Sequence, residues 1–411
     1  MPARFVNLDR PTPLFLPCDL REWIPDGHIV HFILDAVEPL SLSHFQVNQR
    51  GAGSEQYPPA MMLALLIYCY ATGRLGSRTI EAATHSAVAV RYLCANTHPD
   101  HDSICAFRAN NETAFRAAFV RVLQLAQTLR LTKLGTVSVD GTKIQANASK
   151  HSAVSCQRAG ELIAQLELEV NQLLERAQQA EAQASPEPPD LPAEIKRRED
   201  RKAALQKARQ VIEERAKELA AAQAVEYQAK QAARQEQRHA GKKPRGKAPR
   251  PPSAKPDPKA QYNFTDPESR IMKAGSGNHF EQAYNAQAAV ARVEQKADGT
   301  PSGVTVYAAV EKHSHHKTAE DLLPQPEPAA PGPQASAKER MAHRLKTAAG
   351  KSLYKLRKQT VEPVFGIIKE VIGFRRFLLR RRAKVNWEWT LVCVSYNLKR
   401  LFALKNLALA G

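Results

Sequence analysis

Apolar residues in the first third of the chain gather in short runs that Gly and Pro separate. The run from Ala60 to Tyr70 follows Pro58 and Pro59, which favour a helix start, and Gly73 closes it. Ser77 is predicted to cap the next helix, and the pattern predicts helices over residues 78–84, 88–94, 104–108 and 115–125. Residues 1–134 are therefore predicted to be a helical domain. Short helices with exposed arginines are typical of DNA-binding helix-turn-helix modules, although any small helical bundle has a similar pattern.

After this domain the sequence pattern changes from one typical of helices to one typical of strands. The segment Gly135–Val139 is rich in β-branched residues and predicts a strand that ends at Asp140. We assign residues 135–155 to the first strands of an α/β core. Strand candidates at 282–290 and 304–310 predict that this core resumes over residues 261–323. The predicted fold class is mixed α/β and mostly helical.

Residues 156–238 interrupt the core with two apolar seams. The first has apolar residues at alternating steps of three and four: Ile163, Leu166, Val170, Leu173, Ala177, Ala180 and Ala184. A Pro-rich stretch over 185–189 breaks it, and the second runs through Leu205, Ala208, Ile212, Leu219 and Ala222, with Arg215 at a core-like position. The pattern predicts a coiled-coil-like helical hairpin. It is either a clamp on DNA or a dimerisation arm, or else a passive, solvated hairpin, which the nearly balanced charges slightly favour.

Two linkers and a helical end complete the predicted organisation. Residues 239–260 are rich in Lys, Arg and Pro without apolar periodicity, which predicts a disordered basic linker. A Pro/Ala-rich linker covers 324–336. The C-terminal part, 337–411, is predicted to contain four helices, at 337–350, 351–360, 361–372 and 387–409.

Composition narrows the class of partner. The net charge is +18, which favours a polyanion, and nucleic acid is the usual one; a basic surface kept for solubility is the alternative. The six cysteines have no CxxC spacing and are predicted to be free thiols of a reducing compartment. We find neither a signal-peptide pattern nor an apolar run long enough to cross a membrane, so a soluble, cytoplasmic protein is expected.

Two acidic residues in separate motifs, Asp140 and Glu362, are the candidate catalytic and metal-binding residues. Asp140 is predicted at a strand end, and Glu362 at a helix N-terminus with Pro363 in the first helical position. Carboxylate oxygens are the ligands that Mg²⁺ or Mn²⁺ prefers, and such ions cut phosphodiesters. The alternatives are an Asp-Gly turn at Asp140 and a surface acid favoured by the helix dipole at Glu362.

Basic residues surround the second acid. Lys369 lies two helical turns after Glu362, on the same predicted face. Arginines also alternate with Phe374, Phe377 and neighbouring leucines, so the apolar residues are expected to pack inward and the arginines to face DNA. The predicted DNA-binding residues are Arg357, Lys358, Lys369, Arg375, Arg376, Arg380, Arg381 and Arg382.

Taken together, these stretches resemble bacterial insertion-sequence transposases of the DDE class, in particular the group with an InsH-type helical N-terminal domain. The resemblance is carried by Y-P-P-A-M-M-L-A-L-L-I-Y-C-Y-A-T-G, Y-L-C-A-N-T-H-P-D-H-D-S-I-C-A-F-R, V-D-G-T-K-I-Q-A-N-A-S, N-F-T-D-P-E-S-R-I-M, Y-N-A-Q-A-A-V, and L-R-K-Q-T-V-E-P-V-F-G-I-I-K-E-V-I-G-F-R-R-F-L-L-R. It covers nearly the whole chain outside the hairpin and linkers.

The resemblance implies a ribonuclease-H-like core, Mg²⁺ or Mn²⁺ as cofactor, and DNA, both element ends and target, as partner. A metal-activated water would cut the element's end, and the freed 3′-hydroxyl would attack target DNA. By position, Asp140 matches the first acid of the family and Glu362 the last. Asp266 matches a motif before the central strands, with a structural or substrate-adjacent role. A homo-oligomer is a further possible partner state.

The family's second acid, in a pattern such as A-D-A-G-Y, has no counterpart in this sequence. After Y-N-A-Q-A-A-V the chain passes quickly to V-T-V-Y-A-A-V-E-K. We interpret this as an internal deletion of a strand with its acid, which predicts a DNA-binding transposase with impaired catalysis. Two alternatives stay open: an active enzyme that uses Asp298 or Glu311 instead, and a non-catalytic regulator that competes at element ends.

Overall fold

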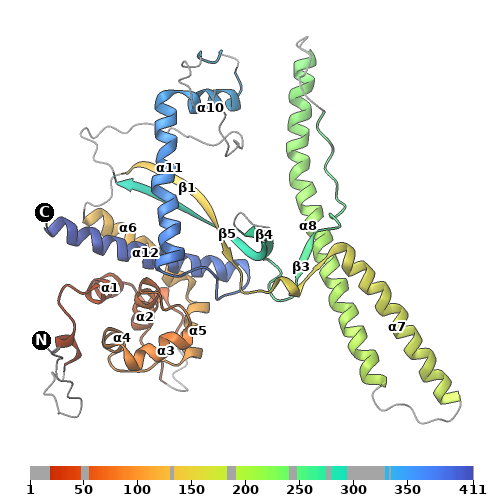
Figure 1. Ribbon diagram of the computed structural model, residues 1–411, viewed down its shortest axis with the longest axis horizontal. Helices are drawn as coiled ribbons and strands as arrows, with labels where there is room; N and C mark the ends of the chain where they lie inside the picture. Colours follow the sequence, from red (N-terminus) through yellow and green to blue (C-terminus); the bar gives the residue numbers. More distant parts are fainter. Residues whose placement is uncertain are drawn as a thin grey trace, which may run out of the picture. The chain divides into compact units, whose positions relative to one another are not determined.

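The computed structural model describes residues 19–47, 55–129, 134–182, 191–239, 248–274, 279–293, 329–332 and 335–410. The chain divides into two compact units. Unit 1 comprises 1–142, 285–379 and 383–411, and unit 2 comprises 143–284 and 380–382. The fold is mixed α/β and mostly helical, as predicted (Figure 1). None of the described helices is both long and apolar enough to cross a membrane.

The N-terminal part of unit 1 is helical, as predicted. Its helices are η1 (Leu20–Trp23), α1 (Ile29–Val37), η2 (Leu42–His44), α2 (Pro59–Ala71), α3 (Ser77–Ser86), α4 (Val88–Leu93), α5 (His101–Asn110) and α6 (Glu112–Thr128). Pro58 and Pro59 open α2 as expected, but Ser77 does not cap α3: it is the first residue of that helix and follows Gly76. Asp100 caps α5, accepting from the backbone N–H groups of Asp102 and Ser103.

Helix α2 is the centre of this helical core. All its residues from Met62 to Ala71 are buried, because α1, α4 and α5 pack around it. Gly73, which follows, has a φ of +81°, a left-handed conformation that favours glycine. The sequence therefore ends α2 where the pattern predicted.

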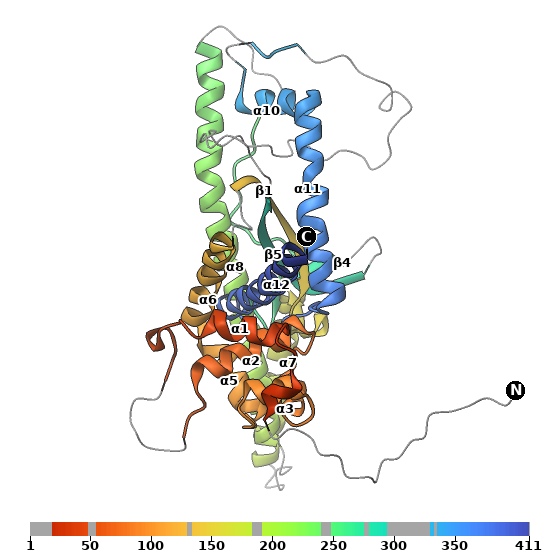
Figure 2. The same ribbon diagram turned by 90° about the vertical axis from the view of Figure 1, so that its left-hand side faces the viewer.

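The C-terminal helices belong to the same unit. They are α10 (Ala337–Lys346), α11 (Ala348–Gly366), the π-helical segment η4 (Ile367–Val371) and α12 (Arg382–Ala410). In α12, Phe402 packs against Phe32 of α1 with ring centroids 5.9 Å apart, and Lys399 Nζ donates to the carbonyl of Ala71 (2.7 Å). Figure 2 shows α12 lying along α1 and α2. Helices from the two ends of the sequence thus share one core.

The predicted helix boundaries in this part were partly wrong. The predicted break between 360 and 361 does not exist, because α11 runs through it to Gly366. The predicted helix 337–350 is instead two helices that meet at Thr347, whose hydroxyl caps α11 by accepting from the Gly350 backbone N–H (3.1 Å). Helix α12 begins at Arg382, earlier than predicted.

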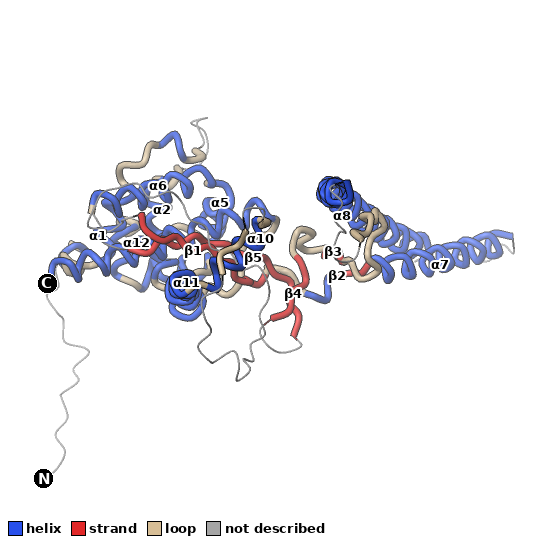
Figure 3. The backbone as a smooth tube through the Cα atoms, turned by 90° about the horizontal axis from the view of Figure 1, so that it is seen from above, coloured by secondary structure: helices blue, strands red, loops and turns tan. Residues whose placement is uncertain are grey.

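Two small sheets form the β structure of the described residues. The larger has the order β1–β5–β4, formed by β1 (Leu134–Gln145), β5 (His279–Val293) and β4 (Arg270–Ala274). Figure 3 shows β1 and β5 side by side. The smaller pairs β2 (Ala153–Ser155) antiparallel with β3 (Gln261–Asn263), with Ser155 opposite Gln261. The predicted strand at 304–310 lies outside the described residues.

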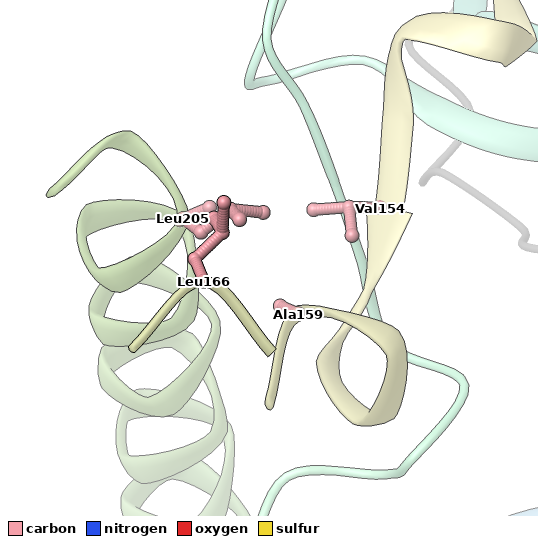
Figure 4. Packing of buried hydrophobic residues seen from close by; sticks show 5 residues of the cluster. Val154, Ala159, Leu166 and Leu205 are labelled. Carbon is pink, nitrogen blue, oxygen red and sulfur yellow. The ribbon is translucent and has the colours of Figure 1, made fainter. Parts of the chain in front are cut away.

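In unit 2, α7 (Cys156–Ala182) and α8 (Leu191–His239) pack side by side as the predicted hairpin (Figure 1). Its core joins Leu166 of α7 to Leu205 of α8, next to β2, as Figure 4 shows; the cluster comprises Val154, Ala159, Leu166, Leu205 and Ala208. Arg198 of α8 also pairs with Glu169 of α7 (2.9 Å).

The second predicted seam holds only in part. It is buried through Ile212 (2% exposed), but Leu219 is 60% exposed. Near Arg209, α8 lies beside Gly160, close to the start of α7, so the rest of α8 extends past its partner. Sequence periodicity gives no information about where a partner helix ends.

Candidate catalytic site

Asp140 lies inside strand β1, not at the end of a strand as predicted. The strand continues to Gln145, because pairing with β5 extends it beyond the β-branched run. The alternative of an Asp-Gly turn is wrong for the same reason. The backbone N–H of Gly141 donates to Oδ1 of Asp140 (2.8 Å). Since side chains alternate along a strand, Asp140 shares its face of β1 with Ser138 and Thr142.

Helix α11 and segment η4 lie beside this face of β1 (Figure 1). Thr360 donates to the hydroxyl of Ser138 (2.7 Å), and Lys369 Nζ donates to the hydroxyl of Thr142 (2.6 Å). The step from Ser138 to Thr142 covers roughly 13 Å of strand. The step from Thr360 to Lys369 covers a similar length, roughly 13 Å of helix. The two hydrogen bonds therefore place Asp140 level with the helical stretch that carries Glu362.

Glu362 lies within α11, four residues before its end, and not at a helix N-terminus as predicted. Pro363 is likewise inside the helix, and its carbonyl accepts from the backbone N–H of Ile367 at the helix C-terminus. Proline is most common at helix starts, which made the prediction wrong at this position. Val361 (0% exposed) and Phe365 (7%) fix the buried side of α11, and Glu362 is exposed beside it.

Lys369 connects the exposed side of the helix to β1. Seven residues make about two helical turns, so Lys369 and Glu362 lie on similar sides of the helix. Partial burial lowers the pKa of Lys369; Glu370 opposes this shift and Arg375 adds to it. Lys369 contacts Thr142, so this flank of the helix borders the face of β1 that bears Asp140, while Thr360, which contacts Ser138, lies on the opposite flank.

A close contact between two of the quoted motifs lies on the other face of β1. A Cβ atom at Gly141 would lie 2.7 Å from Oδ1 and 3.2 Å from Cγ of Asn285, in β5. Any side chain at position 141 therefore displaces Asn285 or the strand. The glycine of V-D-G-T thus allows the Y-N-A-Q strand to approach, next to the candidate acid.

The basic stretch after η4 has the predicted alternation. Phe374 (0% exposed), Phe377 (1%) and Leu379 (7%) are buried, whereas Arg375 and Arg376 are exposed. Gly373, with a φ of +77°, turns the chain out of η4. The side chains of Arg357 and Lys358 lie outside the described part of the structure, so their predicted DNA contacts stay predictions.

A buried polar network that the sequence did not reveal holds this stretch. Glu388 of α12 (0% exposed) accepts from the backbone N–H groups of Leu378 and Leu379 (both 2.9 Å) and from the Tyr70 hydroxyl (3.0 Å). Arg108 donates to the Tyr70 oxygen (3.2 Å). Burial raises the pKa of Glu388, and Arg108 and the hydrogen bonds oppose this shift. The only sequence signal is an acid inside the apolar run W-E-W-T-L-V.

In unit 2, Asp266 is buried (0% exposed) and has structural contacts. Both of its carboxylate oxygens accept from the Tyr284 hydroxyl (2.9 and 3.0 Å), and Oδ1 also accepts from the Arg381 backbone N–H (3.2 Å). The next backbone N–H, of Arg382, donates to Glu268 (2.7 Å), and the Arg380 side chain donates to the Asn147 carbonyl (3.0 Å). These contacts attach the turn at 380–382 to the N-F-T-D-P-E motif.

The described residues contain no group of three or more His, Cys, Asp or Glu side chains placed to hold a metal ion. Asp298 and Glu311, the alternative second acids, lie outside the described residues. Of the predicted catalytic acids, the structure therefore describes two, Asp140 and Glu362.

Comparison with known families matches both ends of the chain. Residues 18–110 match a family described as "Transposase domain (DUF772)", and residues 329–402 match one described as "Transposase DDE domain". Both descriptions are of transposase domains, and together the two matches support an insertion-sequence DDE transposase. No curated protein and no solved structure matches it.

The two matched regions meet in the buried network. Tyr70 and Arg108 lie in the first matched region, and Glu388 in the second. The second region also contains Glu362, Lys369 and the arginines that follow them. Asp140 lies outside both, and its place beside α11 rests on the hydrogen bonds of Ser138 and Thr142.

Proposed function

We propose that this transposase binds DNA at element ends and that its metal-dependent phosphodiester hydrolysis and strand transfer are impaired because the second acid is missing. The observation that carries the proposal is the alignment of α11 with β1, through Thr360–Ser138 and Lys369–Thr142, which brings Glu362 and Asp140 to one level. The core around them is proposed to be ribonuclease-H-like. Its sheet and adjacent helix are consistent with that fold.

The donor set suits a hard divalent ion. Asp140 and Glu362 supply carboxylate oxygens, the ligands that Mg²⁺ or Mn²⁺ prefers, and no thiol or imidazole belongs to the pair. Such an ion, when bound, would activate water and stabilise the leaving oxygen of a phosphodiester. Among the residues that the structure describes, these two carboxylates are a small set for a site with two ions, which supports impaired catalysis.

The basic residues around the pair would position the DNA. Lys369, held by Thr142, offers a cation beside the acids, where a phosphate would lie. Arg375 and Arg376 are exposed in a stretch whose phenylalanines are buried, and Arg375 also pairs with Glu370. Contacts of this kind bind the backbone without reading sequence.

A nicking assay tests the proposal. The full chain is incubated with Mg²⁺ or Mn²⁺ and duplex DNA that carries the element's own ends, beside Asp140→Ala and Glu362→Ala variants. We expect binding to the ends with little or no cleavage. Cleavage that both variants lose would show that another acid completes the site and would contradict the impairment. A wild-type chain that fails to bind the ends would contradict the whole proposal.

A second candidate function is a non-catalytic regulator that competes with intact transposases for element ends. The observation that favours it is the same small acid set. The two candidates differ in one readout: a regulator inhibits cleavage by an intact transposase in proportion to its occupancy of the ends, and the Asp140→Ala variant inhibits equally well. An impaired enzyme shows residual, metal-dependent nicking that this substitution removes.

A further inference from the structure

Two arginines from distant parts of unit 2 converge on one turn. Arg215, from α8, donates through a terminal nitrogen to the carbonyl of Pro267 (2.7 Å). Arg270, at the start of β4, donates to the same carbonyl (3.1 Å) and to that of Ser269 (2.9 Å). Two cations on one neutral oxygen repel each other, so this arrangement is unfavourable unless an anion lies nearby.

A third arginine adds to the local positive charge. Arg382 reaches the same turn, where its backbone N–H donates to Glu268 (2.7 Å). Burial lowers the pKa of Arg270, and the charges of Arg215 and Arg382 lower it further, while Tyr284 and Glu268 oppose the shift. Arg270 therefore lies close enough to both other arginines for their charges to affect it.

The nearby acids are occupied by other donors. Asp266 accepts from Tyr284 and from the Arg381 backbone, and Glu268 accepts from the Arg382 backbone. Across the part of the chain that the structure describes, the guanidinium groups of Arg215, Arg270 and Arg382 form no ion pair. The side chains of Arg215 and Arg270 donate to backbone carbonyls, and a guanidinium has more N–H donors than these contacts use.

The positions of these arginines are fixed in advance. The Arg215 guanidinium lies 5.9 Å from the centre of the Tyr262 ring, in a cation–π contact. The Arg381 backbone is left-handed, with a φ of +68°, which is uncommon for a residue other than glycine, and it places Arg382 on the turn. This also explains the core-like position of Arg215 in the second seam: α8 has left α7 there and meets β3.

We propose that Arg215, Arg270 and Arg382 form a binding site for a backbone phosphate of duplex DNA at the base of the α7–α8 hairpin. This inference rests on the proposed DNA binding and gives the hairpin a part in it. Planar guanidinium groups suit a phosphate, which accepts paired N–H donors. The site contacts the DNA backbone and carries no sequence preference of its own.

The test measures binding of the full chain to a short duplex of arbitrary sequence by fluorescence anisotropy, in EDTA, from 50 to 200 mM salt. Arg215→Gln and Arg270→Gln are each expected to weaken binding several-fold and to lower the slope of log K against log salt by about 1. The matched control is Arg209→Gln. It removes the same charge from the same helix, where the Arg209 side chain instead pairs with Glu213 (3.0 Å), and it should keep the wild-type slope.

Two outcomes separate this inference from the proposed function. Wild-type slopes in Arg215→Gln and Arg270→Gln, with binding retained, would overturn the phosphate site and leave the transposase proposal intact. A wild-type chain that binds no duplex would contradict both. If the glutamine variants do not fold, the wild-type chain is tested instead. Duplex DNA should protect Arg215 and Arg270 from modification by phenylglyoxal, which mass spectrometry maps. Equal modification with and without DNA would overturn the site.

Discussion

At the scale of single residues, Glu388 has the most demanding environment. Its carboxylate is completely buried and organises the backbone at Leu378 and Leu379 together with the Tyr70 hydroxyl. Removing one member of a buried polar network leaves its partners unsatisfied, which costs more than the interaction itself contributes. The acid therefore acts on the basic stretch through position and not through DNA contact.

We expect Glu388→Ala to destabilise the folded protein by about 3–5 kcal/mol, because two N–H groups and a hydroxyl lose their buried acceptor. Urea unfolding followed by circular dichroism measures this change. The control is Glu370→Ala, whose carboxylate is 64% exposed and pairs with Arg375 at the surface, and which should cost less than about 1 kcal/mol. Equal effects of the two substitutions would contradict the role assigned to Glu388.

The buried cysteines report on folding through their pKa. Burial raises the pKa of both Cys69 and Cys94 to about 12, from an ordinary 9.0. Because folding raises these pKa values, burial of the neutral thiols contributes its full stabilisation at any pH below the pKa of the unfolded chain. This contribution to the free energy of unfolding is lost as the pH rises from about 9 toward 12. Iodoacetamide at pH 8 should therefore leave Cys69 and Cys94 unmodified and label Cys156, which is partly exposed. Rapid labelling of Cys69 in the folded protein, mapped by mass spectrometry, would contradict this.

At the scale of elements, sequence patterns predicted the type of each helix or strand better than its boundaries. The apolar run of α2 and the seam through Leu166 and Leu205 were confirmed, because each is set by contacts that local periodicity reports. Strand β1 extends past its β-branched run since pairing with β5 supports the extra residues, and α11 passes through Pro363. Both differences arise from tertiary contacts that a single sequence does not contain.

The hairpin core gives an element-scale prediction. Leu205→Ala is expected to destabilise the α7–α8 pair by about 2–5 kcal/mol, because the side chain is 4% exposed in a packed cluster. Leu219→Ala, on the same helix but 60% exposed, is the control and should change stability little. Hydrogen exchange resolved by mass spectrometry should place the lost protection in α7 and α8. Loss of protection confined to α1–α6 would rule out this account of the hairpin.

At the scale of the whole chain, the two matched transposase regions share one unit. Phe32 packs on Phe402, Lys399 bonds to Ala71, and Tyr70 bonds to Glu388, although these residues are far apart in the sequence. The N-terminal helices therefore bury apolar surface against the C-terminal ones. The domain boundaries predicted from composition, such as the one at 134, stay predictions, since contacts and not composition decide which segments fold together.

We expect a fragment of residues 1–129 to unfold without a sharp transition when expressed alone, because it lacks the partners of Phe32 and Tyr70. Adding residues 335–411 in trans should restore a cooperative transition, measured by calorimetry. Full-length protein is the control. A fragment that melts cooperatively at the full-length temperature would show that the helical domain needs no C-terminal partner.

The candidate site was predictable in identity and only partly in geometry. The V-D-G-T and V-E-P-V-F-G motifs singled out Asp140 and Glu362, and the structure brings their two elements together through Ser138, Thr142, Thr360 and Lys369. Glu388 and Arg270 were missed: a buried acid and a clustered arginine have no sequence spacing that identifies them. The roles of the predicted residues in DNA binding and catalysis stay predictions.

The short β2–β3 ladder has a consequence for how this chain tolerates change. Ser155 lies opposite Gln261, so the chain leaves for the hairpin and returns from it at neighbouring positions of one ladder. An inserted segment whose two ends lie side by side in one strand pair can lengthen or shorten at its far end while the register of that pair stays the same. The hairpin is therefore an insertion whose length can vary without disturbing the rest of the fold. Natural variation in its length is expected to concentrate near the tip, away from the arginines at its base.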